Sequence, residues 1–395
     1  MTDAAWLKSV NSKREHEGRF DLLWNNGPAC DSSIAQSQQP TTHMSHSRSS
    51  SSSMTSSSSH SQPERFDYSS GRWSPKERFW VAHQPFLLSR GYRLRPRYDP
   101  NWIPSWEQSG DPIDKTHCED SIYNVKCILM DATRISDNCQ AVIKLVEPWT
   151  DEIPVARYLS SQTASSDPRN HSVPVLDVIL SPSDDDLAFL VMPLLLDFER
   201  FPFRRVGEVT EAFQQFLEGL EFMHEHNIAH RDACYFNLML DASNIVPNGF
   251  HFIRRATEDG VKPIKELERW SVRPVKYYFI DFELSTKYPA GATHVMDVGF
   301  LGQDKSVPEM SLTVPYNPFK VDVYQLGNVF LGIVDKYDDL EQFRPLCLAM
   351  TEQDPALRPS AAAALQQFEA VVRSLTTADL ERRIWFRHLD PIWRF

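Results

Sequence analysis

The chain of 395 residues carries 41 Lys and Arg against 53 Asp and Glu, which gives a formal net charge of −12 at pH 7. This acidic balance, together with the lack of a basic stripe with interleaved aromatic residues, argues against nucleic-acid binding. The apolar fraction of 41%, with 10 Trp and 23 Phe, suffices for a sizeable core in one large domain or two ordinary ones.

The cysteines and the apolar segments indicate the cellular compartment. The six cysteines stand far apart without a CxxC pair, which argues against a zinc site and against the disulfide framework of a secreted protein. The N-terminal stretch MTDAAWLKSV has no apolar signal-peptide core, and the longest apolar run, residues 187–196, is too short to span a bilayer. We therefore expect an intracellular protein, cytoplasmic or nuclear, that does not cross a membrane.

The first 75 residues have the composition of a disordered segment. Between residues 45 and 61, 12 of 17 residues are Ser, and none is a large aliphatic or aromatic residue. Such a stretch buries too little apolar surface to offset the entropy of ordering, so residues 1–75 are predicted to be largely disordered, above all 25–72. A plain linker is the simpler interpretation, and a multiply phosphorylated tail is the alternative.

Residues 76–117 are dense in aromatic, Arg and Pro residues. We expect an ordered extension that packs on the domain after it, with a short helix over 76–88 and a strand near 92–97.

Residues 118–196 are predicted to form a small lobe rich in strands. Two apolar, β-branched runs flank the turn sequence SDN and predict a β-hairpin over 125–146. Residues 150–162 predict a helix with Thr150 as its N-cap. Two further strands complete the lobe, over 173–181 and 186–195.

Residues 197–375 are predicted to form a larger, mostly helical lobe. Large apolar residues recur on one stripe over 208–227, which predicts a long amphipathic helix. Residues from about 242 to 275 are rich in charged and turn residues and are expected to form a surface insertion. Residues 376–395 would form a C-terminal tail. Two short strands and two later helices are expected over 238–241, 276–281, 321–334 and 359–375.

Strands first and helices second predict an α+β protein with two lobes. The order of the motifs AVIK, HRDACYFN, IDFE and VPE resembles the eukaryotic protein-kinase domain, over about residues 118–372. More narrowly, GYRLRPRY, NWIPSW, NHSVPVLDVI and YYFIDFELS resemble a fungal, basidiomycete-type family of protein-kinase-like proteins. The resemblance implies a two-lobed protein-kinase-like fold, ATP and Mg²⁺ as cofactors, and phosphoryl transfer to Ser or Thr of a protein substrate.

The resemblance assigns the chemistry to five residues. Lys144, on a strand, would hold the α- and β-phosphates, and Glu152 at the start of the next helix would orient it. Asp232 would accept or orient the proton of the attacking hydroxyl. Asn237 and Asp281 would bind Mg²⁺ through oxygen, the ligand type that this cation prefers. Taken singly, these residues have plain alternatives, such as a strand lysine, a helix-cap carboxylate or a turn residue.

The segment between the two lobes is also expected to bind adenine. Met192 would lie behind the ring, the Pro193 carbonyl would accept a hydrogen bond, and the Leu195 N–H would donate one. Proline keeps its carbonyl although it lacks an N–H. Val142 would cover the ring from the strand that carries Lys144.

Other residues are expected to support the fold without chemistry. Glu309 of VPE would form a buried pair with Arg358, and Asp322 at a helix start would hold the backbone of the catalytic loop. His230 and Phe282 would stack in an apolar column between the lobes. These features favour a protein kinase over a small-molecule phosphotransferase, which is the weaker alternative.

Three departures from the family pattern bear on activity. No glycine-rich loop occurs near residues 122–127, where glycines would let the backbone approach phosphate. Cys234 stands where a lysine usually neutralises the γ-phosphate, with Phe236 offering no substitute, and losing such a contact typically costs on the order of 10²–10³ in rate. Glu283 replaces the glycine of Asp-Phe-Gly and adds a negative charge near the metal site. We expect slow catalysis; the alternative is a pseudokinase, a scaffold that binds nucleotide or partners without turnover.

Nearby basic residues are candidate substitutes for the missing cation. Lys126, Lys287 and Lys305 are the nearest in sequence, although each alone has the plainer interpretation of a solvated surface lysine.

In the family, an arginine in the position of Arg231, next to the catalytic aspartate, often binds a phosphate on the activation segment. VPE (307–309) resembles the end of that segment. Thr293 and Ser306 are the candidate phosphorylation sites.

Overall fold

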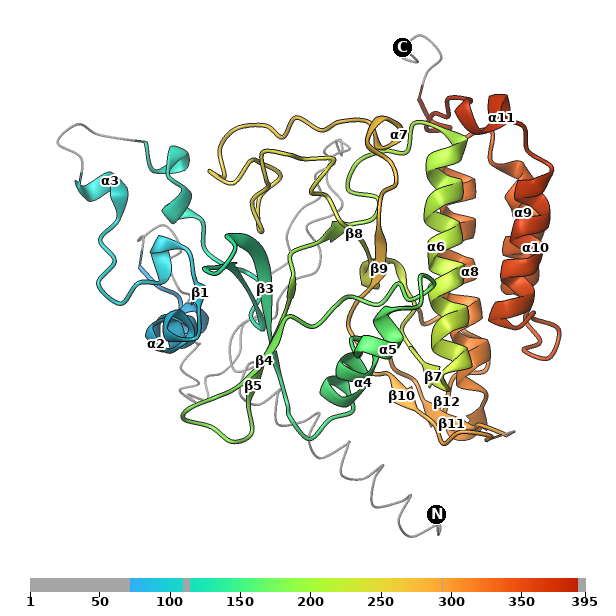
Figure 1. Ribbon diagram of the computed structural model, residues 1–395, viewed down its shortest axis with the longest axis horizontal. Coiled ribbons are helices and arrows are strands. Elements are labelled where there is room, and N and C mark those ends of the chain that lie inside the picture. The colour runs from blue at the N-terminus through green and yellow to red at the C-terminus, as the bar shows by residue number, and fades with distance from the viewer. Residues whose placement is uncertain (1–71, 109–113, 293, 390–395) are drawn as a thin grey trace, which may run out of the picture.

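The computed structural model describes residues 72–108, 114–292 and 294–389. The Ser-rich segment, and with it nearly all of the region predicted to be disordered, lies outside these residues. The described chain has a mixed α+β structure, as expected, with an antiparallel sheet beside a group of helices (Figure 1).

The main sheet has five antiparallel strands in the order β1-β2-β3-β5-β4. The predicted hairpin is present, with β2 at Leu129–Arg134 and β3 at Cys139–Val146. Because β1 pairs with β2, the predicted extension supplies an edge strand of this sheet. The remaining strands β1, β4 and β5 cover Tyr92–Arg93, Asp177–Leu180 and Ala188–Pro193.

The two faces of the sheet have different surroundings. Helix α2, Pro75–Ser89, begins at a capping box and packs on the face that carries Ile143. Successive strand residues point to opposite faces, so Lys144 lies on the other side, toward the helical part. Residues directly opposite on neighbouring strands share a face, and on the Lys144 side Val142 therefore lies next to Met192.

The helix predicted over 150–162 is wrong in its length and its start. Helix α4 covers Glu152–Leu159 with Asp151 rather than Thr150 at the N-cap, and a separate helix α5 covers Gln162–Ser165. The break occurs because the Ser161 side chain accepts a hydrogen bond from a backbone N–H three residues later and so caps a new helix.

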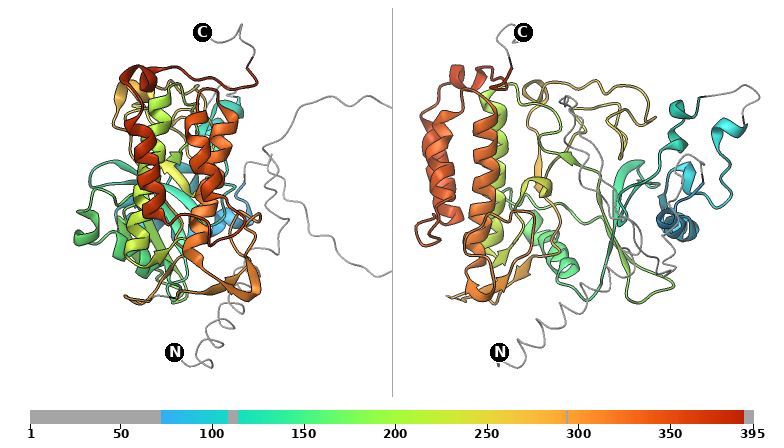
Figure 2. Two further views of the ribbon diagram at one scale, coloured as in Figure 1. Left: turned by 90° about the vertical axis from the view of Figure 1, so that its right-hand side faces the viewer. Right: turned by 180° about the vertical axis from the view of Figure 1, so that it is seen from behind.

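The helical part is built around α6, Val206–Glu225, and α8, Pro318–Lys336. The predicted apolar stripe of α6 is buried, and Phe213 stacks on Phe330 of α8 with ring centroids 3.8 Å apart. Helices α10 and α11 pack on α6, and α9 packs on α8 (Figure 2). These three helices cover Arg344–Met350 (α9), Ala361–Arg373 (α10) and Thr377–Glu381 (α11).

Further short strands and single helical turns complete the fold. Strands β6, β8 and β9 form a three-stranded sheet at Leu196–Asp197, Leu238–Leu240 and Tyr277–Phe279. Two pairs of strands cover Ile228–Ala229 (β7) with Thr286–Lys287 (β10), and Asp297–Gly299 (β11) with Ser311–Tyr316 (β12). The remaining turns cover Pro96–Tyr98 (η2), Ser105–Gln108 (α3), Lys115–His117 (η3), Glu119–Ser121 (η4), Tyr235–Asn237 (η5) and Glu341–Phe343 (η6). Within the described ranges, every helix is too short or too polar to cross a lipid bilayer.

The predicted insertion lies between β8 and β9 and contains one short helix, α7, at Arg269–Val272. It arches from the region of β8 and β9 toward the N-terminal extension (Figure 1). At one point His251 Nε2 lies 3.3 Å from Arg95 Nη1 of the extension. At another, the Arg269 guanidinium donates to the Phe198 carbonyl near the start of the helical part. The insertion therefore joins the extension to the helical part.

Candidate active site

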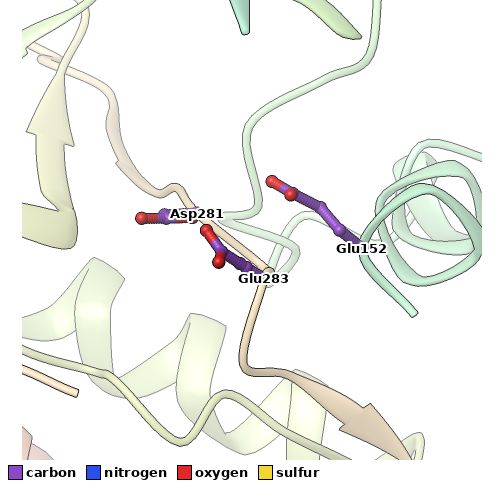
Figure 3. Close-up of side chains that lie close together, drawn as sticks. All are labelled: Glu152, Asp281 and Glu283. Carbon is purple, nitrogen blue, oxygen red and sulfur yellow. The ribbon is translucent and has the colours of Figure 1, made fainter. Parts of the chain in front are cut away.

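The Lys144 ammonium lies in a cluster of three carboxylates. Its Nζ atom is 2.7 Å from Glu152 Oε1, 2.6 Å from Asp281 Oδ1 and 3.4 Å from Glu283 Oε2. Figure 3 shows Glu152 extending from α4 toward the loop that carries Asp281 and Glu283. The structure thus brings together Lys144, Glu152 and Asp281 of the predicted site, with Glu283 beside them. The short connection after β3 leads directly into the first turn of α4 and so places Glu152 near Lys144.

The charges of this cluster shift its pKa values in different directions. Burial raises the pKa of Glu152 to about 7, against the attraction of Lys144 and with the added repulsion of Asp281. Burial also opposes ionisation of Asp281, but Lys144 outweighs it and holds the pKa of Asp281 below its ordinary value. For Lys144, burial alone would lower the pKa, yet Glu152 and Asp281 raise it. Lys144 therefore stays charged at neutral pH.

The loop around Asp232 is fixed by Asp322, as predicted. The buried Asp322 carboxylate accepts hydrogen bonds from the backbone N–H groups of His230, at 2.8 Å, and Arg231, at 2.6 Å. These bonds hold the backbone of Arg231 in the left-handed region, with φ 66°, a conformation that residues other than glycine rarely adopt. The His230 ring contacts Phe282 at a centroid distance of 5.3 Å, tilted by 50° rather than stacked.

Asp232 and Asn237 lie side by side in this loop. The Asn237 Nδ2 atom donates to the Asp232 backbone oxygen at 2.9 Å and to Asp232 Oδ2 at 3.0 Å. A backbone hydrogen bond connects this loop to the acidic cluster. The Ile280 N–H donates to the Asn237 backbone oxygen at 3.0 Å, and Asp281 is the residue after Ile280. The pair Asp232–Asn237 and the Lys144 cluster are therefore neighbours.

The oxygen donors near Lys144 fit a hard divalent cation. Because Asn237 commits its amide N–H group to Asp232, its amide oxygen faces away and remains available. The Asp281 side chain is 38% exposed and has one oxygen on Lys144, which leaves the second oxygen for a ligand. Carboxylate and amide oxygens are the ligands that Mg²⁺ prefers. Glu283 contributes a further exposed carboxylate within 4.8 Å of those of Glu152 and Asp281.

The residues predicted to contact adenine lie on β3 and at the end of β5. Met192 is buried directly opposite Val142, on the sheet face that carries Lys144. Pro193 is the last residue of β5, and Leu195 lies just before β6. Both are partly exposed. This arrangement suits a flat ring beside the lysine, with its edge against the chain that leaves β5.

No protein-family model matches the chain, and no curated protein matches it either.

Sequence reasoning missed a polar network on the same face of the sheet. Asp131 lies opposite Val142 and binds Arg95 Nε at 3.1 Å. Arg95 also binds Glu119, and His251 of the insertion completes the group. An open cavity of about 1040 Å³ lies beside this network and is lined by its four residues rather than by Lys144. No local pattern pointed to this pairing, because the partners are far apart in the sequence.

The surroundings of Asp232 were also missed. Its Oδ1 atom accepts a hydrogen bond from the Gln303 backbone N–H at 2.8 Å, and Oδ2 accepts one from Gln303 Nε2 at 3.2 Å. The Cys234 thiol lies against the same carboxylate, and burial, with the charge of Asp232, raises its pKa well above the ordinary value. Among the described residues, the groups that donate to the Asp232 carboxylate are all neutral.

The three lysines considered as substitutes each lie over an aromatic ring. The distances from Nζ to the ring centroid are 4.4 Å for Lys126 on Phe252, 2.9 Å for Lys287 on Tyr158 and 5.2 Å for Lys305 on Phe300. Gln303, rather than one of these lysines, contacts Asp232.

The activation-segment predictions have mixed outcomes. Glu309 and Arg358 form the predicted buried pair, with two hydrogen bonds of 2.5 and 2.8 Å. Arg231 pairs with Asp297, at 3.3 Å. Ser306 Oγ donates to Asp304. Thr293 lies outside the described residues.

Proposed function

We propose that this protein is a two-lobed, protein-kinase-like phosphotransferase that binds ATP and Mg²⁺ between its sheet and its helical part. Its substrate would be a Ser or Thr hydroxyl of a protein. The observation that carries the proposal is the contact of one strand lysine, Lys144, with both Glu152 and Asp281, next to the pair of Asp232 and Asn237.

Each of these side chains has a physical task in the proposed reaction. Lys144 supplies a positive charge for the phosphate oxygens, and Glu152 keeps its ammonium in place. Asp232 accepts a hydrogen bond from the attacking hydroxyl and orients it toward phosphorus. A bound Mg²⁺, held by Asn237 and Asp281, would neutralise charge on the phosphates.

A pseudokinase is the second candidate, and one observation favours it. No cation donates to Asp232 within the described residues, and this residue is only 7% exposed. The lysine missing at Cys234 would neutralise the γ-phosphate, and losing such a contact costs on the order of 10²–10³ in rate, about 3–4 kcal/mol. A scaffold that binds nucleotide without turnover would tolerate that loss.

Two measurements on the full chain test the proposal. The first is the thermal shift caused by ATP with and without Mg²⁺. The second is transfer from γ-radiolabelled ATP to a Ser/Thr peptide library, for the wild type, Asp232→Asn and the exposed control Asp185→Asn. We expect a Mg²⁺-dependent shift and slow transfer that Asp232→Asn abolishes and Asp185→Asn leaves unchanged.

The other outcomes separate the two candidates. A Mg²⁺-dependent shift without Asp232-dependent transfer would identify a pseudokinase. The absence of any nucleotide shift would contradict both nucleotide-based functions.

A further inference from the structure

Gln303 makes three hydrogen bonds in the loop of Asp232. Its backbone N–H and its side-chain amide donate to the two carboxylate oxygens of Asp232. Its amide oxygen Oε1 accepts a hydrogen bond from the Phe236 backbone N–H at 3.2 Å. One side chain thus bridges the carboxylate and the backbone of the same loop, two residues after Cys234.

The residue before Gln303 brings the backbone close to this carboxylate. Gly302 has φ +81°, and a Cβ atom at this position would lie 2.7 Å from Asp232 Oδ1. Only glycine allows this approach without a shift of the carboxylate. The backbone at Gly302 and Gln303 therefore lies against the Asp232 carboxylate. From this position the Gln303 side chain reaches both Asp232 Oδ2 and the Phe236 N–H.

Neutral donors account for the orientation of Asp232. Asn237 Nδ2 and Gln303 Nε2 both donate to Oδ2, while the Gln303 N–H donates to Oδ1. A carboxylate accepts about four hydrogen bonds, and these three donors together with the Cys234 thiol supply that number, so an acceptor hydroxyl would replace the thiol, the weakest of the four donors. The amide also has an acceptor for the Phe236 N–H, which an ammonium does not have.

We propose that Gln303 is a positioning residue that orients the Asp232 carboxylate in a loop where Cys234 stands in place of the usual lysine. Its amide fixes the plane of the Asp232 carboxylate and ties it to the backbone at Phe236. The amide supplies no charge to the phosphate, so phosphoryl transfer stays slow although the Asp232 carboxylate is correctly oriented. This inference rests on the proposed phosphotransfer.

Three variants test this role. Gln303→Ala removes the amide, and Gln303→Glu keeps its length and one acceptor oxygen. The glutamate can donate to Asp232 only when it is protonated, and when ionised it repels the carboxylate. Gln353→Glu, at an exposed position, is the matched control for the added charge.

The kinetic readout is kcat and KM for ATP across pH 5.5–8.5 (a span of about 3 units), with γ-radiolabelled ATP and a Ser/Thr peptide library. We expect kcat to fall about tenfold to a hundredfold in Gln303→Ala, because misplacing a reacting group costs up to about 10², with KM for ATP unchanged. For Gln303→Glu we expect the deficit relative to wild type to shrink as pH falls. Gln353→Glu should follow the wild type. Unchanged or faster transfer in Gln303→Ala, or a Gln303→Glu deficit that does not vary with pH, would overturn the proposal.

A second measurement does not depend on turnover. Gln303→Glu should destabilise the wild type at pH 8, because two carboxylates then face each other, and this loss should vanish in an Asp232→Asn background. Equal losses in both backgrounds would overturn the contact itself. If the contact is present and the wild type transfers no phosphate, the proposed function fails, and with it the positioning role in the reaction.

Discussion

Arg231 and Asp297 form an ion pair, with 3.3 Å between Arg231 Nη1 and Asp297 Oδ2. The guanidinium is 9% exposed and also lies 3.4 Å from the Val298 backbone oxygen. The position that would receive a phosphate in a phosphorylated segment therefore already has a carboxylate from the chain itself.

This pairing predicts that the segment does not need a phosphate for its order. Asp297→Asn should lower the free energy of unfolding by about 3 kcal/mol, because it leaves Arg231 buried without its counterion. Urea denaturation measures this loss. Asp137→Asn, which breaks an exposed pair with Arg134, should cost less than about 1 kcal/mol. Phosphatase treatment that destabilised the wild type as much as Asp297→Asn does would contradict the prediction.

Removing one partner of the pair Glu309–Arg358 is expected to cost more stability than breaking an exposed ion pair of the helical part. Arg358 is fully buried, and its two nitrogen atoms bind both carboxylate oxygens of Glu309. Glu309→Ala should therefore cost about 3–5 kcal/mol. The exposed pair Arg373–Glu369 provides the control, since Glu369→Ala should cost at most about 0.5 kcal/mol. Similar losses for the two variants would show that burial does not set the strength of the pair.

Replacing Lys144 should make stability depend on pH. In the wild type, Lys144 lowers the pKa of Asp281, and this stabilisation is present above the unfolded pKa and lost as pH falls. In Lys144→Met the carboxylates face each other without a cation, so their pKa values rise and stability is lost as pH increases. We expect the loss to be larger at pH 8 than at pH 5.5 in thermal unfolding (both values set by the roughly 4–7 range of carboxyl pKa values). Lys262→Met, at an exposed position, should show no such trend.

Glu152 gives the opposite sign in the wild type. Its pKa in the folded protein is about 7, above the value of 4.5 for a free side chain, so the folded state binds more protons between these values. Its contribution to stability is thus complete below the unfolded pKa and is lost as pH rises to about 7. Glu152→Gln should flatten the stability profile over this window, while the exposed control Glu381→Gln should not. Parallel profiles for wild type and Glu152→Gln would disprove the assignment.

Elements with a strong local pattern could be predicted from the sequence. The hairpin β2–β3 and helix α6 follow from a turn sequence between β-branched runs and from a single apolar stripe. The helix over 150–162 was predicted as one piece from its N-cap signal, which marks where a helix begins but not where it ends. The capping hydrogen bond of Ser161 decides where α5 begins.

Side chains that meet across long sequence separations could be predicted only where a motif marked them. Lys144 and Asp281 are 137 residues apart and were found through the family resemblance. No sequence motif pointed to Gln303, because its contacts with Asp232 depend on the positive φ of Gly302 and on the path of the activation segment. The pair of Arg95 and Asp131 was missed for a related reason. A carboxylate on a strand is normally expected to face solvent, and no local pattern in the sequence marked its partner.

The contact between Arg95 and His251 has a consequence for biosynthesis. These two residues are 156 positions apart, so the ribosome exposes the extension on the order of ten seconds before the insertion that completes the network. During that interval a nascent chain holds Arg95 and Asp131 without their final neighbour. The polar network of Arg95, Asp131, Glu119 and His251 therefore forms completely only after translation has passed the middle of the chain.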